Sequence, residues 1–598
     1  MNITPSPLKV NLLLGSPNEQ YVIPSYQRRY SWQVRQIWEF IDDIRLLEDG
    51  DAHLLGTIVC LTGEHTAGLN KLELVDGQQR LTTITIVLTC IQQHLESKGQ
   101  SKKATEIAGL LTAQAFDGDP QRKVALDSID AADFDRLVSR DLSQQVKNLQ
   151  LQAAFAIFRD WVSEQSSEVL NAFLYRLRNQ TVVIRLDVSA AKDAFKLFET
   201  INNRGLRLSP TDIIKNFLLG NSARFSADAL KSAQSSWATL IVNLDGTNSD
   251  AFFRYYLMAQ VQTRVTASEV VPGIKKLFMR QVVEAGTLPE RHLYSDIGED
   301  DEEEEDATLG SDVGSADPAL DKVTVVSGKV SFADFLARLV GSAKVYGELV
   351  LAKTSDGQVN RHLRNLRMIK AVQTYGFLMH LRTGKCSKLN FREVLALTES
   401  FVLRRHVCRE RANETEALFA RLCAVDPSDP VLPTKDAYRE LCPSDDKFRE
   451  EFAAASFPAT LIDRARYCLE HLEEAKHGQH DELQVLGASD VHVEHIIPQK
   501  IKTKKSKEEF GDWVEYLGDK AEALHPRYVA RIGNLTVFAG KLNISASNNP
   551  FGMKKKAYKE SAIKLTQELA KLLQFKFKDV DKRSMDLARA AVELWPRP

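Results

Sequence analysis

Residues 74–83, LVDGQQRLTT, join a short apolar segment to a polar loop and then to a long apolar stretch. The residues from Lys71 to Val75 alternate as a β-strand does, and those from Leu81 to Glu96 are long and periodic enough for a helix. The N-terminus of a helix offers backbone N–H groups and the positive end of the helix dipole, and so it is a standard place for a phosphate. This stretch therefore predicts a strand, a tight anion-binding loop and a helix.

Three side chains of the loop favour that interpretation. Gly77 lets the backbone approach a ligand closely, Arg80 provides a two-pronged donor for a phosphate, and Asp76 could hold a magnesium ion or orient a water molecule. A capped helix that carries a surface arginine explains the same spacing, so the spacing alone leaves both interpretations open. The loop is not a Walker A loop, because the pattern GxxxxGK[ST] does not occur here.

The chain changes character at an acidic block. Residues 299–306 read EDDEEEED, and the Gly-, Ser- and Asp-rich residues that follow cannot bury enough apolar surface to order themselves. Before the block, strand patterns at 53–61, 71–75 and 181–187 alternate with helical ones, and after it helical periodicity dominates. We therefore expect an α+β multidomain protein, with a mixed α/β domain and its helical elaboration over 1–294, an acidic flexible linker or insertion over 295–329, and a mainly helical domain over 330–598.

The composition is that of a globular protein, since hydrophobic residues are 43% of the 598 and charged residues 26%. The 78 basic and 80 acidic residues nearly cancel, which excludes a global basic surface for nucleic acid but leaves local basic patches to consider. The seven cysteines include no CxxC pair, so neither a disulfide framework nor a thiolate zinc site is indicated. No apolar run is long enough to span a membrane, and the N-terminal residues do not fit a signal peptide, so we expect a cytoplasmic protein.

Two further segments of the first domain carry clustered polar and aromatic side chains. Residues 23–32, IPSYQRRYSW, place Arg28 among two tyrosines and a tryptophan. This mixture suits stacking on a base and holding a phosphate, and it equally suits an aromatic anchor for the segment. In residues 198–216, Ser209 and Asp212 fit the N-terminus of a helix. The cap leaves unexplained the polar residues Asn202, Arg204 and Lys215 around it.

Near the C-terminus, a histidine lies between the patterns of two short strands. Residues 491–498 read VHVEHIIP, and the second strand pattern, RIGNLTVF, follows a lysine-rich loop. Cutting a phosphodiester needs a base that activates water, and His495 can be that base. The acid beside it, Glu494, and the later amide Asn543 can hold a hard cation such as Mg²⁺. Asn534 could orient the histidine or the loop between the strands, or merely shape a turn.

Lysines cluster on both sides of this histidine. One group follows the first strand pattern, and another lies within residues 551–559. A polyanion at His495 would lie between both groups, and its binding would depend strongly on salt. The alternative is a solvated loop and helix face. The lysines that we expect to contact DNA are Lys504, Lys505, Lys554, Lys555 and Lys556.

Three segments, in this order and spacing, resemble the N-terminal domain of GmrSD-type modification-dependent restriction enzymes: IPSYQRRYSW, LLGTIV with LVDGQQRLTT, and FETINNRGLRLSPTDIIKNFLL. That domain is similar to the ParB-like nucleotidase superfamily, and the resemblance covers residues 1–220 most densely. It implies a domain that binds and hydrolyses a nucleoside triphosphate. The residues that it places at the nucleotide are Arg28, Asp76, Gly77, Gln78, Gln79, Arg80, Asn202, Arg204, Asp212 and Lys215.

The pattern VEHIIPQ…GNLTV…LN…K resembles the HNH (His-Me finger) nuclease domain of the same enzymes, with its core over residues 490–560. The ββα-metal motif of that domain implies that His495 is the catalytic base and that Asn534 belongs to the catalytic set. It also implies that Glu494 and Asn543 bind Mg²⁺ or Mn²⁺, although Asn543 stands where the motif commonly has histidine.

Together, the two resemblances imply a nucleotide-dependent DNA endonuclease of antiphage defence, of the type IV restriction class. It would cleave or nick modified double-stranded DNA by metal-assisted hydrolysis, and the nucleotide would gate the nuclease. The residues do not distinguish GTP, ATP or UTP, and they leave a homo-oligomer open. The alternative is a nucleotide-responsive sensor of DNA modification, or a regulator, whose nuclease motif is vestigial.

Overall fold

The computed structural model describes residues 3–48, 50–62, 68–115, 118–141, 143–202, 209–287, 329–478, 491–501, 513–539 and 549–598. The chain divides into two compact units. Within the described ranges, the first unit comprises residues up to 257, 266–287 and 329–344, and the second comprises 258–265 and 345–598. The acidic linker predicted over 295–329 lies outside the described residues, apart from Lys329.

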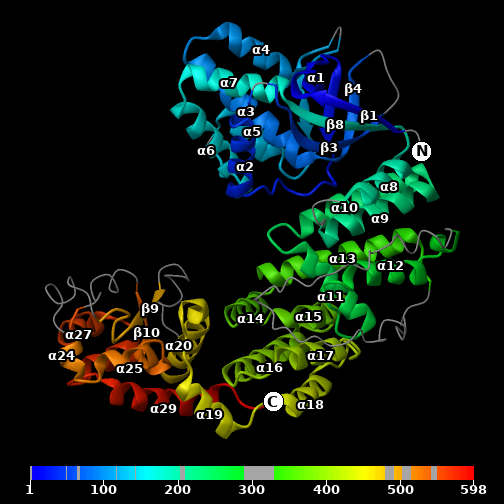
Figure 1. Ribbon diagram of the computed structural model, residues 1–598. Helices are drawn as coiled ribbons and strands as arrows, with labels where there is room; N and C mark the ends of the chain where they lie inside the picture. The colour runs from blue at the N-terminus through cyan, green and yellow to red at the C-terminus, as the bar shows by residue number, and fades with distance from the viewer. Residues whose placement is uncertain are drawn as a thin grey trace. The chain divides into compact units, whose positions relative to one another are not determined.

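The first unit is built on a mixed sheet of six strands: β1 (Ile3–Lys9), β2 (Glu19–Ile23), β3 (His53–Thr62), β4 (Asn70–Asp76), β7 (Val124–Leu126) and β8 (Thr181–Val188). Their order across the sheet is β1-β8-β3-β4-β2-β7 (Figure 1). Strand β8 pairs antiparallel with β1 and parallel with β3, β3 pairs antiparallel with β4, and β2 lies parallel to β4 and β7. The strands predicted at 53–61, 71–75 and 181–187 are confirmed as β3, β4 and β8.

Helix α3 (Gln78–Ser97) follows β4 after one glycine, so the predicted succession of strand, tight loop and helix is confirmed. The helix begins three residues earlier than the apolar pattern indicates, because the polar residues Gln78, Gln79 and Arg80 form its first turn. Its remaining residues are buried as far as Ile91, among α4 and α6.

The other helices that lie wholly in this unit are α1 (Val10–Gly15), α2 (Val34–Arg45), α4 (Ser101–Leu111), α5 (Ala131–Ser139), α6 (Leu149–Glu164), α7 (Ser167–Asn179), α8 (Ala191–Asn202), α9 (Pro210–Phe225), α10 (Ala227–Asn243) and α12 (Val270–Gln281). Helices α11 (Ser249–Val261) and α13 (Phe332–Leu351) contain residues of both units. Two short strands, β5 (Thr112–Ala113) and β6 (Gln121–Arg122), pair antiparallel beside them. The apolar faces of the sheet and of α1 to α7 enclose one buried core, which fixes the loop between β4 and α3 relative to α2.

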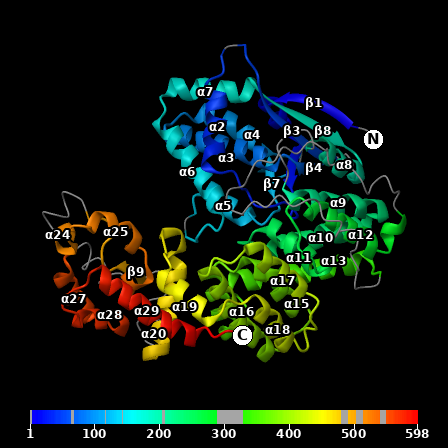
Figure 2. The same ribbon diagram turned by 60° about the horizontal axis from the view of Figure 1, so that its bottom comes forward.

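The second unit is mainly helical and carries a small two-stranded sheet. Strands β9 (Val491–His495) and β10 (Leu535–Ala539) pair antiparallel, and helix α27 (Phe551–Glu560) packs on the same core. In Figures 1 and 2, α29 (Phe577–Leu594) runs beside α19 (Asp445–Ala454) and α20 (Ile462–His477). The other helices are α14 (Gly357–Met368), α15 (Tyr375–Thr383), α16 (Lys388–Val407), α17 (Ala412–Leu422), α18 (Val431–Leu441), α24 (Trp513–Leu517), α25 (Ala521–Tyr528) and α28 (Lys564–Gln567).

The coarse fold class, a mixed α+β and mostly helical multidomain chain, is therefore as predicted. Residues 329–344, which include the start of the predicted second domain at residue 330, belong to the first unit. The reason is aromatic packing, since the rings of Phe332 and Phe335 lie 5.9 and 5.7 Å from the ring of Phe278.

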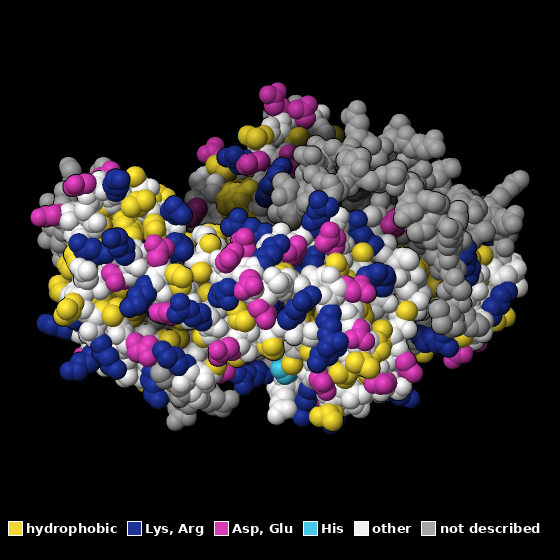
Figure 3. Space-filling view, turned by 90° about the horizontal axis from the view of Figure 1, so that it is seen from below, with side chains coloured by type: hydrophobic (Ala, Val, Ile, Leu, Met, Phe, Trp, Pro, Cys, Tyr) yellow, Lys and Arg dark blue, Asp and Glu magenta, His cyan; other side chains and the backbone are white. Residues whose placement is uncertain are grey.

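Three further observations bear on what the composition led us to expect. On the face shown in Figure 3, basic and acidic side chains are interspersed, as expected from nearly equal numbers of each. Among the helices of the described ranges, none combines the length and the apolar character that a membrane span requires. All seven cysteines are buried free thiols.

Candidate functional site

The loop between β4 and α3 depends on a glycine. Gly77 has a φ of 94°, which residues with a side chain rarely adopt, and an added Cβ would lie 2.3 Å from Ile58 Cγ2. Gly77 is also the N-cap of α3, and as a glycine it has no side chain that could cap the amides of the first turn. The amides of the first turn are therefore available to hold an anion.

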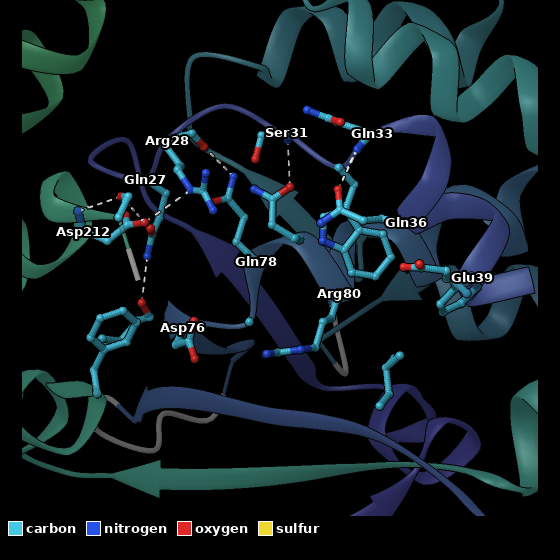
Figure 4. A pocket seen from close by; sticks show the side chains of 18 of the residues that line it. Gln27, Arg28, Ser31, Gln33, Gln36, Glu39, Asp76, Gln78, Arg80 and Asp212 are labelled. Atoms are coloured by element: carbon cyan, nitrogen blue, oxygen red, sulfur yellow. Dashed lines mark hydrogen bonds and ion pairs between the residues drawn. The ribbon is translucent and has the colours of Figure 1, made fainter. Parts of the chain in front are cut away.

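Arg80 lies across strand β3. Its Nη1 donates to the Thr57 carbonyl oxygen at 2.5 Å, and an added Cβ on Gly56 would lie 3.0 Å from its Nε. Gly56, with a φ of 118°, thus leaves the room that the guanidinium occupies. In Figure 4 the guanidinium extends toward Asp76. Burial raises the pKa of the Asp76 carboxyl, and the positive charge of Arg80 acts against that rise.

The side chains of the loop glutamines form hydrogen bonds with backbone groups of the segment 23–32. Gln78 Nε2 donates to the Arg28 carbonyl oxygen at 2.7 Å, and Gln79 accepts from the Ser31 N–H at 2.8 Å. In return, Gln27 Nε2 donates to the carbonyl oxygens of Leu74 and Val75, at 3.0 and 2.9 Å. These bonds join the segment 23–32 to the loop, so the glutamines position the site.

The tyrosines of segment 23–32 are anchors. Tyr26 is 2% exposed and donates to Glu73 Oε1 at 2.5 Å, and Tyr30 is 1% exposed with its hydroxyl 2.9 Å from Thr83 Oγ1. Of the two interpretations that the sequence leaves open, the anchor therefore holds for both tyrosines. Trp32 is the aromatic residue of this segment that lines the pocket.

Helix α9 brings an acid and a lysine to the same place. Ser209 Oγ caps the helix by accepting from the Asp212 N–H at 3.2 Å, as predicted. Lys215 is 3% exposed and donates to Gln27 Oε1 at 2.7 Å, and burial lowers its pKa. Asp212 lies 3.7 Å from the Lys215 ammonium and 3.5 Å from Arg28 Nε, so one carboxylate holds two cations at the pocket wall (Figure 4).

These elements enclose a pocket of about 800 Å³. Every predicted nucleotide residue whose side chain is described lines it: Arg28, Asp76, Gly77, Gln78, Gln79, Arg80, Asp212 and Lys215. The predicted Arg204 and the side chain of the predicted Asn202 lie outside the described residues.

The opposite wall of the pocket comes from α2, the two residues before it and β3, and most of it was not predicted from the sequence. Its residues are Trp32, Gln33, Arg35, Gln36, Glu39, Phe40, Asp43 and Leu55. In Figure 4, Gln33, Gln36 and Glu39 lie together, on the far side of the pocket from Asp212. The rings of Trp32 and Phe40 lie 6.1 Å apart. In the sequence, only the aromatic end of the segment IPSYQRRYSW indicated this wall. The amides and acids of α2 have the pattern of an ordinary solvent-exposed helix face.

The second candidate site lies at the β9–β10 hairpin, where His495 is opposite Leu535 and Glu494 is opposite Thr536. Asn534 precedes β10 and is fully buried. Its Oδ1 accepts from the Ile497 N–H at 2.8 Å, and its Nδ2 donates to the carbonyl oxygens of Ile497 and Val529 at 2.9 Å each. Asn534 therefore holds the chain that follows His495, which is one of the roles left open for it.

The imidazole of His495 keeps weak contacts. Both ring nitrogens lie 3.4 Å from Gln499 Nε2. Burial lowers the pKa of His495 to about 4, with the charges of Lys554 and His525 acting in the same direction. The ring is neutral at pH 7, which is the form that a general base needs.

The structure corrects the prediction for Lys554. Its side chain is 1% exposed, its Nζ lies 2.5 Å from Glu494 Oε1, and it donates to the His495 carbonyl oxygen at 2.8 Å. A buried, paired lysine does not form part of a DNA-binding surface. Lys556 on the same helix is exposed and Lys555 is half-buried, while Lys504 and Lys505 lie outside the described residues.

The predicted metal pair does not fit the described residues. The Glu494 carboxylate faces the Lys554 ammonium, and Asn543 lies outside the described ranges. Within those ranges, no group of three or more His, Cys, Asp and Glu side chains could hold a metal ion.

Two family models match the chain, in the same order along the sequence as the two candidate sites. Residues 10–219 match the GmrSD restriction endonuclease N-terminal domain, and residues 442–590 match the GmrSD restriction endonucleases C-terminal domain. A search of curated proteins found no match. The first match contains the pocket and the second contains the β9–β10 hairpin, and together they span more than half of the chain. The chain therefore belongs to the GmrSD restriction endonuclease family.

Proposed function

We propose that this restriction nuclease is a nucleotide-dependent DNA endonuclease, in which a ParB-like first unit binds and hydrolyses a nucleoside triphosphate and an HNH site at the β9–β10 hairpin cuts DNA. The observation that carries the proposal is the convergence of Arg28, Arg80 and Lys215 on one pocket beside the N-terminal end of α3, whose N-cap is a glycine. The substrates of such an enzyme are modified double-stranded DNA and a nucleoside triphosphate.

The pocket suits a nucleotide in size and in polarity. Its volume of about 800 Å³ lies within the range of small-molecule sites. One wall offers Arg28, Arg80 and the first-turn amides of α3, which are donors for phosphate oxygens. The other wall offers Trp32 for stacking, with side-chain amides and carboxylates for the polar edge of a base.

For the nuclease site, the chain's own residues support a general-base role. Neutral His495 takes a proton from water, which attacks phosphorus, and Asn534 holds the chain behind it. A bound Mg²⁺ or Mn²⁺ would supply Lewis-acid stabilisation of the leaving oxygen. The family resemblance implies this ion, but the described donors do not fit it, because Glu494 is paired with Lys554.

The test is a cleavage assay on modified and unmodified DNA, with each nucleotide and with Mg²⁺ or Mn²⁺ added in turn. We expect His495→Ala to remove cleavage and to leave nucleotide turnover unchanged. Arg80→Ala should remove turnover and, because the nucleotide gates the nuclease, alter cleavage as well. Retained nicking by His495→Ala would contradict the assigned base, and unaltered cleavage by Arg80→Ala would contradict the gating.

One observation favours a second candidate function. Because Glu494 is already paired with Lys554, the hairpin resembles a nuclease motif that has lost its metal set. The chain would then act as a nucleotide-responsive sensor of DNA modification, or as a regulator. Plasmid nicking in Mg²⁺ by the wild-type chain would exclude this candidate, and modification-dependent DNA binding without nicking would support it.

A further inference from the structure

The pair formed by Glu494 and Lys554 connects two elements of the second unit. Glu494 comes from β9 and Lys554 from α27, and their side chains are buried, with 8% and 1% of each residue exposed. The same ammonium that lies 2.5 Å from Glu494 Oε1 also donates to the His495 carbonyl oxygen at 2.8 Å. One cation thus joins the helix to the carboxylate and to the main chain at the end of β9.

The opposite charges of Glu494 and Lys554 compensate each other in the interior. Either partner without the other would leave an uncompensated charge in the interior, which is strongly unfavourable. A metal ion on the same Glu494 oxygen would bring a second cation next to the Lys554 ammonium, and like charges at that distance repel. The observed geometry therefore gives Glu494 a counter-ion other than a metal.

The chain around His495 is held on both sides. Lys554 binds the carbonyl oxygen of His495 itself, and Asn534 binds both backbone groups of Ile497, two residues further on. The imidazole, in contrast, has only the weak contacts to Gln499 among the residues that the structure describes. Within the described part of the chain, the hydrogen bonds to the backbone at His495 and Ile497 are therefore the stronger restraints on its position.

We propose that Glu494 and Lys554 are positioning residues for His495, and that Glu494 keeps the ammonium in place instead of binding a metal ion. The activity readout of this inference rests on the proposed nuclease function, whereas its structural readouts do not. It replaces the metal-ligand role that the sequence implied for Glu494.

The experiment compares Glu494→Gln, Lys554→Met and the double variant in the full-length chain. Lys578→Met serves as the control for loss of a lysine, because Lys578 is exposed on α29 and lies outside the two lysine groups on either side of His495. Three properties are measured: cleavage kinetics, the ¹³Cε1 signal of His495 in a histidine-labelled sample, and Mn²⁺ binding by electron paramagnetic resonance. The His495→Ala variant assigns the histidine signal.

We expect each single variant to lower the kcat of cleavage by about tenfold or more with little change in KM, because the base is misplaced while DNA contacts remain. Each should also shift the His495 signal. The double variant should be no less active and no less stable than the worse single variant, since it leaves no unpaired charge. Mn²⁺ binding by Glu494→Gln should equal that of the wild type.

Loss of Mn²⁺ binding in Glu494→Gln, with Lys554→Met retaining both binding and cleavage, would overturn the inference and restore the metal role. So would fully additive losses in the double variant. If the wild type cleaves no DNA, the proposed nuclease function fails by itself. The histidine signal and the unfolding of the single and double variants still decide whether the pair positions His495.

Discussion

Substitution of Gly77 by alanine tests the account of the anion-binding loop most directly. The backbone term comes from the φ of 94°, where a residue with a Cβ costs about 1–2 kcal/mol. The packing term comes from Ile58, because the new Cβ would lie 2.3 Å from its Cγ2 and 3.1 Å from its Cα. The Cα belongs to the backbone of β3, so rotation of the Ile58 side chain cannot remove the clash, and overpacking of this kind costs about 1–3 kcal/mol.

The sum predicts that Gly77→Ala lowers the free energy of unfolding by about 2–5 kcal/mol. Urea denaturation of the full-length chain measures this value, and nucleotide titration of the same sample should show a loss of affinity, because the α3 amides move. Gly109→Ala is the matched control, since Gly109 lies in α4 with no atom within 4 Å of an added Cβ. The control should be neutral or more stable by about 0.5–1 kcal/mol. A Gly77→Ala variant that is as stable as the wild type and binds nucleotide normally would refute the reasoning.

Three further predictions concern the second unit. Asn534→Ala removes three hydrogen bonds of 2.8–2.9 Å and should lower the free energy of unfolding by about 2–4 kcal/mol in urea denaturation, with cleavage lost and DNA affinity retained. Lys556→Ala should reduce the slope of log affinity for DNA against log salt by about 1, and an unchanged slope would remove Lys556 from the interface. His406 has a pKa of about 4 instead of 6.5, because burial and the charge of Arg464 disfavour its protonated form. Between pH 6.5 and pH 4 the unfolded chain therefore binds more protons than the folded chain. His406 should lower the free energy of unfolding by about 3 kcal/mol as the pH falls from 6.5 to 4. Denaturation at several pH values measures this loss, and His406→Gln should abolish it.

The sequence predicts the backbone of the first candidate site, because the determinants of that backbone are local. A strand, one glycine and a helix start are consecutive in the chain, so periodicity and turn chemistry predict the loop that carries Asp76, Gly77 and Arg80, while the nucleotide role of these residues comes from the family resemblance. The α2 wall of the same pocket is different, because Gln36, Glu39 and similar residues acquire meaning only when the sheet places α2 opposite the loop. Tertiary placement of this kind leaves no mark on a single sequence.

The error at Lys554 has a physical cause that the sequence does contain. Lys554, Lys555 and Lys556 read as one basic run, but consecutive helical residues point about 100° apart. Lys554 follows Phe551 by three residues and precedes Tyr558 by four, so all three share the buried face of α27, whereas Lys556 points to solvent. A buried lysine requires a buried acid, and Glu494 beside His495 is the acid that meets it. Reading the run by helical phase rather than as a block therefore separates the lysine that supports the site from those that remain available to DNA.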